Sequence, residues 1–161
     1  MRIDQVVVNA SPLITLFRSG QAGLLPQLFQ KIVVPDAVWT EVTGGEQDDP
    51  AAQELVVESW PVREFVMTSP RVAVWNLGDG ETSVLSYALE NPAYRAIVDD
   101  AAARRCARTL GVNVLGTGGV LVLAKQRGLI VSVAEAVNKL RQAGLWLSDD
   151  VARLLLERAG E

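Results

Sequence analysis

The stretch that decides the fold lies near the start of the chain and reads Gln5-Val6-Val7-Val8-Asn9-Ala10-Ser11-Pro12-Leu13-Ile14. Its valine run has no polar break, which is typical of a strand buried on both faces of a parallel sheet. The spacing then becomes helical, with Ser11 placed as the N-cap and Pro12 at the first helical position. A buried strand that passes directly into a helix is the repeating unit of α/β proteins.

The alternation of strand and helix continues along the chain. Further strands are predicted at 31–34, 96–98 and 112–115, with weaker candidates at 63–67 and 72–75. Further helices are predicted at 22–29, 36–42, 51–58, 79–90, 101–110, 120–126, 133–142 and 149–158. This order implies a parallel sheet covered by helices on both sides. Since no repeat or linker interrupts the pattern, we expect one α/β domain over residues 1–161.

The composition excludes several classes of catalytic site. The chain has 161 residues, no histidine and a single cysteine, Cys106. Histidine-dependent catalysis and zinc sites built from histidine or several cysteines are therefore impossible. Any bound metal must have oxygen ligands, which indicates a hard cation such as Mg²⁺ or Mn²⁺.

The same composition predicts a cytoplasmic location. A lone cysteine cannot form an internal disulfide, which favours a reducing compartment. The first four residues begin no long apolar leader. The longest uncharged run, between Arg108 and Lys125, is shorter than the ~20 apolar residues of a membrane span. With 49% hydrophobic residues, we expect a folded, soluble protein without a membrane segment.

The charges are unevenly distributed along the chain. The net charge of −4 argues against a broad phosphate-binding surface. Residues 101–134 nevertheless contain no acid and five basic side chains, Arg104, Arg105, Arg108, Lys125 and Arg127. This basic strip is compatible with nucleic acid, although charge alone favours an ordinary solvated helix face.

Polar side chains follow two of the predicted strands, where each strand ends. Asn9 follows the first strand, and Asp99 and Asp100 follow the strand at 96–98. Ligand sites of parallel sheets form outside the carboxyl ends of the strands, so these groups should share one edge. We expect the carboxylates of Glu81 and Asp99 to lie within reach of a common cation.

Two glutamates share the apolar faces of their helices. Glu81 lies three and four residues before Val84 and Leu85, and Glu41 lies three residues after Val38. Both are therefore predicted to point inward, where a cation would compensate their charge.

Each of these polar residues also has a purely structural explanation. Asp99 or Asp100 could cap the helix that begins at residue 101 and pair with Arg104. Glu81 could form a surface pair, Glu41 could face water, and Asn9 is a common turn residue. Because all of these explanations would have to hold together, we favour a functional cluster.

The order of four short motifs resembles that of PIN-domain proteins. The motifs are Asn9-Ala10-Ser11-Pro12-Leu13-Ile14, Pro35-Asp36-Ala37-Val38-Trp39-Thr40-Glu41, Gly78-Asp79-Gly80-Glu81-Thr82, and Asp99-Asp100 with Arg104. The resemblance spans nearly the whole chain and is closest to a PIN-like subfamily of bacteria and archaea. The stretch Gly116-Thr117-Gly118-Gly119-Val120-Leu121 is also similar to that subfamily; it lacks a nucleotide-binding pattern and is interpreted as a tight strand-to-helix turn.

The resemblance implies a three-layer α/β/α sandwich with a central parallel sheet and a metal-dependent ribonuclease activity. It implies that Mg²⁺ or Mn²⁺ is bound by Asn9, Glu41, Glu81 and Asp99, with Asp100 as a further ligand. Ser11 matches a small hydroxyl residue beside the first acid, and Arg104 and Arg108 could hold the substrate phosphate. The implied biological role is the toxin of a toxin–antitoxin pair, with RNA as substrate, a small antitoxin as partner and a homodimer as assembly.

Asn9 departs from the family pattern, which has an aspartate at this position. An amide oxygen can still coordinate a hard cation, but the site loses one negative charge. The sequence therefore leaves an alternative open, a catalytically weak or inactive PIN-like module that binds RNA or another protein. A nucleotide-binding protein of Rossmann type is disfavoured because the glycine fingerprint is missing.

Overall fold

The structure is a computed structural model that describes residues 4–45 and 48–161. The described residues form a five-stranded sheet in the order β3-β2-β1-β4-β5, and every neighbouring pair is parallel. The strands are β1 (Gln5–Val8), β2 (Lys31–Pro35), β3 (Pro61–Glu64), β4 (Arg95–Ile97) and β5 (Val114–Leu115).

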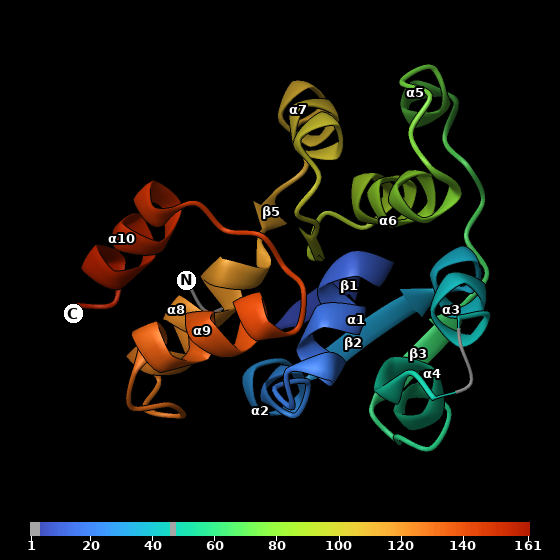
Figure 1. Cartoon of the computed structure of the whole chain (residues 1–161). Coiled ribbons are helices and arrows are strands. Elements are labelled where there is room, and N and C mark those ends of the chain that lie inside the picture. Colours follow the sequence, from blue (N-terminus) through green and yellow to red (C-terminus); the bar gives the residue numbers. More distant parts are fainter. Residues whose placement is uncertain (1–3, 46–47) are drawn as a thin grey trace.

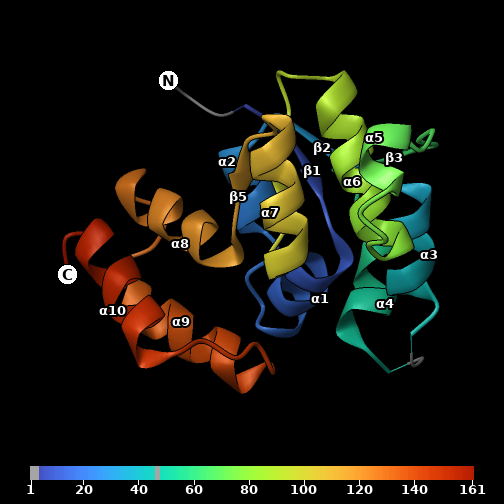
Figure 2. The same cartoon turned by 90° about the horizontal axis from the view of Figure 1, so that it is seen from above.

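Helices connect the strands and cover both faces of the sheet (Figure 1). They are α1 (Ala10–Arg18), α2 (Leu24–Leu28), α3 (Asp36–Thr43), α4 (Pro50–Leu55), α5 (Pro70–Ala73), α6 (Asp79–Glu90), α7 (Ala101–Leu110), α8 (Thr117–Gln126), α9 (Val133–Gln142) and α10 (Asp149–Arg158). Helices α5, α6 and α7 lie on one side of the sheet, and α1, α2 and α4 lie on the other. Figure 2 shows α8, α9 and α10 packed together beside the β5 end. The three-layer α/β/α sandwich is thus confirmed.

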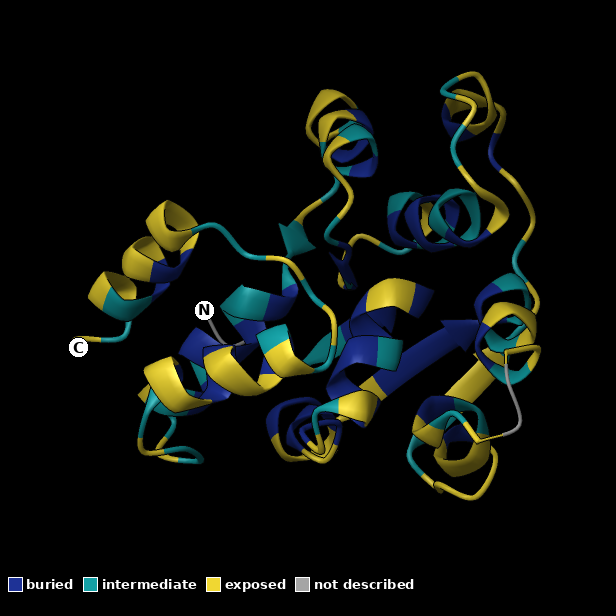
Figure 3. Cartoon of the chain, viewed as in Figure 1, coloured by how far each residue is buried: buried dark blue, intermediate teal, exposed yellow. Residues whose placement is uncertain are grey.

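The core is centred on β1, the middle strand. Val6, Val7 and Val8 have no exposed surface, because helices cover this strand from both sides. Figure 3 shows burial along the central strands and on the helix faces that turn toward them, whereas β3 and β5 at the two edges are less buried. The uninterrupted valine run therefore correctly predicts that this strand is buried.

Several expected boundaries differ from the structure. The weak strand candidate at 72–75 is wrong, because residues 70–73 form helix α5 with Pro70 at its first position, where proline is well tolerated. Strand β3 begins at Pro61 and ends at Glu64, so the chain from 65 to 67 lies beyond the sheet. The first three residues of the chain lie outside the described residues. So do residues 46 and 47, which belong to the polar loop expected at 46–50.

Two helices begin earlier than expected. Helix α1 starts at Ala10, so Asn9 rather than Ser11 takes the N-cap position, and Pro12 lies in the first turn. Helix α8 starts at Thr117 rather than near residue 120. The first turn of α8 therefore includes Gly118 and Gly119, and the expected turn is reduced to Gly116.

Candidate metal centre

The sheet brings Asn9 and Asp99 to the same edge. Val8 pairs with Ile97 in the parallel ladder, and the backbone N–H of Asn9 continues it by donating to the Ile97 carbonyl at 3.0 Å. Asp99 follows two residues after Ile97. Both side chains therefore leave the sheet at its carboxyl edge, the usual position of ligand sites in such sheets.

The amide oxygen of Asn9 is buried without a partner. Asn9 is 3% exposed, and its Oδ1 accepts no hydrogen bond from any described residue. Leaving a buried acceptor unsatisfied costs about 1–3 kcal/mol. A hard cation is one of the few ligands that would satisfy such an oxygen, because carbonyl-type oxygens are among its preferred ligands.

Gly80 is the residue that lies next to the Asn9 amide oxygen. A Cβ atom at Gly80 would lie 3.0 Å from Asn9 Oδ1, 3.5 Å from Val38 Cγ2 and 4.0 Å from Glu41 Oε1. Gly80 is buried in the first turn of α6, where α6 packs against α3. The missing side chain at Gly80 leaves room between the Asn9 amide and the Glu41 carboxylate.

Glu41 stands at the outer rim of this space. The residue as a whole is exposed in the last turns of α3, although Val42 beside it is buried. Its Oε1 would lie 4.0 Å from a Cβ on buried Gly80, so the carboxylate turns toward this space rather than into the core. The pKa of its carboxyl is nevertheless raised, first by partial desolvation and then by the negative charges of Glu81 and Asp79. Three acids therefore share one region and repel one another.

Glu81 and Asp79 both belong to the first turn of α6. Glu81 is half-buried, and its carboxylate folds back over Gly78. A Cβ atom placed on Gly78 would lie 2.6 Å from the Oε2 atom of Glu81. Asp79 is exposed. The positive end of the helix dipole offsets part of their charge. We call Asn9, Glu41, Asp79, Gly80 and Glu81 the Asn9 group.

Asp99 is held by a residue that the sequence analysis did not select. Its Oδ1 accepts a hydrogen bond from the Thr117 N–H at 2.8 Å, and its Oδ2 accepts one from the Thr117 hydroxyl at 2.5 Å. Thr117 is fully buried at the first position of α8. Asp99 thereby caps α8 from the end of β4.

Asp100 has a different role from its neighbour. Its Oδ2 accepts a hydrogen bond from the Ala103 N–H at 2.9 Å, and it is the N-cap of α7. This is the structural explanation that the sequence left open for one of the two aspartates. Asp100 is exposed, and its carboxylate is directed to α7 rather than to the Asn9 group.

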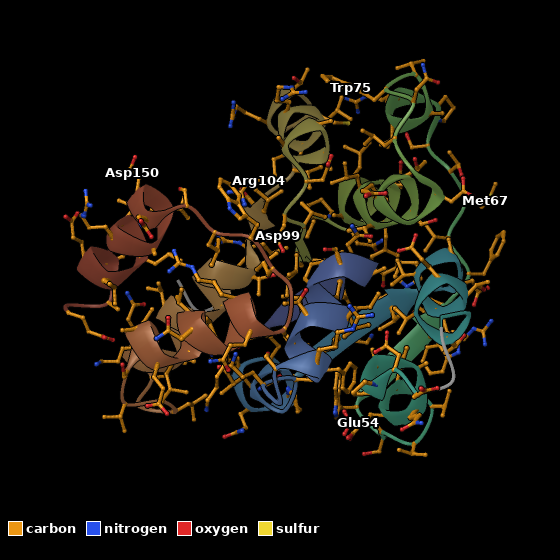
Figure 4. All side chains as sticks on the ribbon, viewed as in Figure 1. Glu54, Met67, Trp75, Asp99, Arg104 and Asp150 are labelled. Carbon is orange, nitrogen blue, oxygen red and sulfur yellow. The ribbon has the colours of Figure 1, made fainter. Side chains whose placement is uncertain are left out.

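Arg104 approaches Asp99 from α7. Its Nη1 donates to the Val98 carbonyl at 3.5 Å. A Cβ at Gly116 would lie 2.8 Å from Arg104 Nη1 and 3.2 Å from Asp99 Oδ1, so both side chains border Gly116; Figure 4 shows them between α7 and α8. Arg108 is exposed in the last turn of α7, and Ser11 is exposed on α1. Of the three predicted substrate-binding residues, Arg104 is thus the one shown beside the Asp99 carboxylate.

The candidate ligands fit a hard cation by their chemistry, but they do not form a closed site. All of them offer oxygen atoms, and Asn9 Oδ1 has no other partner among the described residues. Over residues 4–45 and 48–161, however, no three acidic or cysteine side chains stand close enough together to hold a metal ion. Glu81 lies over Gly78, and Asp99 accepts hydrogen bonds from Thr117. The approach of these two carboxylates to a common cation stays a prediction.

The residues that the sequence analysis missed carry weak signals. Asp79 and Gly80 belong to the Gly78-Asp79-Gly80-Glu81 motif. A glycine has no side chain, so it gives no sign in the sequence that it borders a binding site. Thr117 directly follows Gly116 at the end of β5. A polar residue after a strand is the same signal that selected Asn9 and Asp99, so Thr117 could have been found by that rule.

Comparison with known families gives one match. A family model described as a PIN domain matches residues 5–161. No curated protein and no solved structure gives a match to the chain. In the described ranges, every helix is too short or too polar to cross a bilayer. Because the matched region covers almost the whole chain and the fold agrees, the chain belongs to the PIN-domain family.

Proposed function

We propose that the protein is a divalent-metal-dependent endoribonuclease that hydrolyses phosphodiester bonds of RNA at the carboxyl edge of the sheet. PIN domains are generally nucleases that use divalent metals and bind nucleic acid. The observation that carries the proposal is the unpartnered, buried Oδ1 of Asn9, which faces the space between Gly80 and Glu41.

The ligands that we propose for Mg²⁺ or Mn²⁺ are Asn9, Glu41, Glu81 and Asp99. When bound, such an ion supplies activation of a water molecule and stabilisation of the charge that develops on the leaving oxygen. Asp79 adds negative charge beside these ligands. Asp100 is a weaker candidate than the sequence indicated, since its carboxylate caps α7.

Arg104 is the residue best placed to bind the phosphate of the substrate. It borders Gly116 together with Asp99, and its guanidinium can form paired hydrogen bonds to phosphate oxygens. Arg108 lies one helical turn further along α7 and could extend this contact along the RNA backbone. Ser11 follows Asn9 closely and offers a hydroxyl on the first turn of α1.

The family resemblance supports a wider proposal about the biological role. The protein would act in the cytoplasm as one PIN-like domain spanning residues 1–161, as the toxin of a toxin–antitoxin pair. A small antitoxin and a second copy of the chain would be its protein partners.

A second candidate function is a module that binds RNA or a partner protein without cleaving RNA. Asn9 favours it, because the amide removes a negative charge where the family has an acid. The hydrogen bonds from Thr117 to Asp99 favour it too, because both carboxylate oxygens already have partners. Weak metal binding would follow from either feature.

Cleavage of a labelled RNA in Mn²⁺ by three proteins distinguishes the two functions. Asn9→Asp should tighten metal binding and raise cleavage above the wild type, since the added carboxylate strengthens the field on the ion. Asp99→Asn should lower cleavage, and a chelator should abolish it. Cleavage that persists undiminished in Asp99→Asn would indicate a contaminant, and a lack of cleavage by all three proteins would favour the binding module.

A further inference from the structure

A cavity of about 190 Å³ lies beside the β5 edge of the sheet, where α8 and α10 pack together (Figure 2). Its polar lining residues are Arg95 at the start of β4, Gln126 at the end of α8 and Arg158 at the end of α10. An apolar part of its wall is formed by Leu115, Val122 and Leu123. No acidic side chain belongs to the described lining, so two arginines determine the charge of the cavity.

Neither arginine has a partner for its charge. Over residues 4–45 and 48–161, the guanidinium groups of Arg95 and Arg158 form no hydrogen bond and no ion pair. Glu161, three residues after Arg158, accepts hydrogen bonds from the first turn of α9 and from Lys125, so its carboxylate is directed away from the cavity. Two positive charges that border one cavity repel each other, and an anion between them would remove this repulsion.

The helix dipole explains only one of the two arginines. Arg158 lies in the last turn of α10, where a cation offsets the negative end of the dipole. Arg95 begins β4 in register with Val6, and its side chain shares a face of the sheet with Ile97, which is fully buried. Arg95 itself is half-buried, and a partly desolvated charge without a partner is unfavourable. A bound anion would compensate the charge of Arg95.

The charge and the size of the cavity indicate a phosphate monoester. Such a group carries about −1.5 to −2 charges at pH 7 and has three free oxygens, which matches two guanidinium groups and their N–H donors. A phosphodiester within an RNA chain has one charge and only two free oxygens, so it is the poorer match. Pockets for drug-sized ligands usually have volumes of about 300–1,000 Å³. The smaller cavity therefore fits the phosphate and the first atoms of the group attached to it, which the apolar wall would contact.

This cavity is separate from the candidate metal centre. Arg95 is the first residue of β4, whereas Asp99 follows the carboxyl end of that strand. Four residues of extended chain separate the two Cα atoms by roughly 13 Å. The cavity would therefore hold a different phosphate from the one that we expect Arg104 to contact beside Asp99.

We propose that Arg95 and Arg158 bind the phosphate group of a phosphate monoester in this cavity, with the side-chain amide of Gln126 as a further donor. The bound phosphate connects β4 to α10, which itself packs on α8 and α9. Two sources supply this chemistry, a free mononucleotide and the 5′-phosphate end of an RNA strand. The proposal does not depend on nuclease activity.

Calorimetric titration of the full chain with phenyl phosphate tests this site, in a buffer free of divalent metal so that the Asn9 group does not contribute. The wild type should bind with a Kd below about 1 mM. Arg95→Gln and Arg158→Gln should each raise this Kd by about tenfold or more, since each removes charge-assisted hydrogen bonds. Arg153→Gln, on exposed α10, removes the same charge and should leave the Kd unchanged.

Two further comparisons locate the bound phosphate. Arg104→Gln should also leave the Kd unchanged; loss of binding in this variant, with binding kept in Arg95→Gln, would place the phosphate beside Asp99 and overturn the proposal. Arg158 is exposed, so Arg158→Gln should fold normally even if the half-buried Arg95 proves necessary for folding. Failure to detect binding at about 10 mM phenyl phosphate, or binding that Arg158→Gln leaves unchanged, would also overturn the proposal.

The two sources of the phosphate are distinguished with adenosine 5′-monophosphate and with two labelled RNAs that differ only in a 5′-phosphate or a 5′-hydroxyl group. Tighter binding of the phosphorylated RNA, lost in Arg158→Gln, would identify the RNA end as the ligand. Binding of adenosine 5′-monophosphate that depends on Arg158, with equal affinity for the two RNAs, would identify a free nucleotide. Both results support the site, because in each the phosphate monoester is bound through Arg158.

Discussion

Both carboxylate oxygens of Asp99 accept hydrogen bonds from one residue, Thr117, through its backbone N–H at 2.8 Å and its hydroxyl at 2.5 Å. Asp99 lies in the short connection between β4 and α7, and Thr117 is the first residue of α8. The pair therefore ties the carboxyl edge of the sheet to the helix that follows β5. It also sets the orientation of one of the four proposed metal ligands.

We first predict that Thr117→Val destabilises the protein more than Thr117→Ser. Valine removes the hydroxyl donor to a charged carboxylate, which should cost about 1.5–3 kcal/mol. Serine keeps the donor and loses one buried methyl group, which should cost about 0.8 kcal/mol. Urea unfolding of the three proteins measures the difference. A Thr117→Val protein as stable as the wild type would mean that the hydroxyl contact contributes nothing.

The second prediction concerns the charge of Glu41. Because Glu41 is repelled by Glu81 and Asp79, Glu41→Gln should stabilise the metal-free protein by about 0.5 kcal/mol, a typical value for exposed charges. Mn²⁺ should raise the melting temperature of the wild type, because it binds only the folded state, and raise that of Glu41→Gln less.

Glu54→Gln is the matched control for this experiment, since Glu54 is an exposed glutamate of α4 outside the Asn9 group (Figure 4). It should change neither the metal-free stability nor the response to Mn²⁺. If Glu41→Gln behaves in the same way, Glu41 is not a ligand.

The third prediction is a pH dependence that arises from Asp49. The hydrogen bonds from Arg18 at 2.5 and 3.2 Å hold the pKa of Asp49 below its usual value of 3.8, and the Ala51 N–H adds to this effect. A lowered pKa means that the folded state favours the carboxylate. This stabilisation is complete above the unfolded pKa and is lost as the pH falls through 3.8 toward the folded pKa.

Asp49→Asn removes this titration while keeping an N-cap residue for α4. The variant should therefore be less stable than the wild type at about pH 7, and the difference should shrink toward about pH 3. Asp150→Asn, which removes an exposed partner of Arg153, should show no such trend. Urea unfolding at several pH values checks both, and a gap between wild type and Asp49→Asn that widens on acidification would contradict the assignment.

The sequence predicts the central part of this fold well because local and global signals agree there. The valines of β1 are buried on both faces, and the boundaries of α6 and α7 follow from periodicity and flanking polar residues. The segment from 61 to 75 was ambiguous because β3 is an edge strand with exposed side chains, which weakens its apolar pattern. Helix α5 is too short to show any periodicity.

The candidate site was only partly predictable for a related reason. Strand ends identify Asn9 and Asp99, since sequence position alone places them at the carboxyl edge. Helical spacing places Glu41 on the face of Val38, but it cannot show that Glu41 is exposed while its neighbour Val42 is buried. The contact of Asp99 with Thr117 joins residues that are 18 positions apart, so only the folded chain reveals it.

The last prediction uses Gly80 to separate metal binding from stability. A Cβ at this position would enter the space between Asn9 Oδ1 and Glu41, at 3.0 Å from the amide oxygen. Alanine is favoured over glycine within a helix by about 0.5–1 kcal/mol, which should offset the tight contact. Gly80→Ala should therefore fold with a metal-free melting temperature close to that of the wild type.

The increase in the melting temperature of Gly80→Ala on addition of Mn²⁺ should be much smaller than that of the wild type. The reason is that the added methyl group occupies the place where a cation would contact the amide oxygen of Asn9. Gly23→Ala is the matched control: a Cβ at Gly23 would meet no atom within 4 Å, and the residue lies beside α2, outside the Asn9 group. This control should keep the full increase in melting temperature. Thermal unfolding with and without Mn²⁺ measures both variants, and an undiminished response of Gly80→Ala would show that any cation binds without the Asn9 amide.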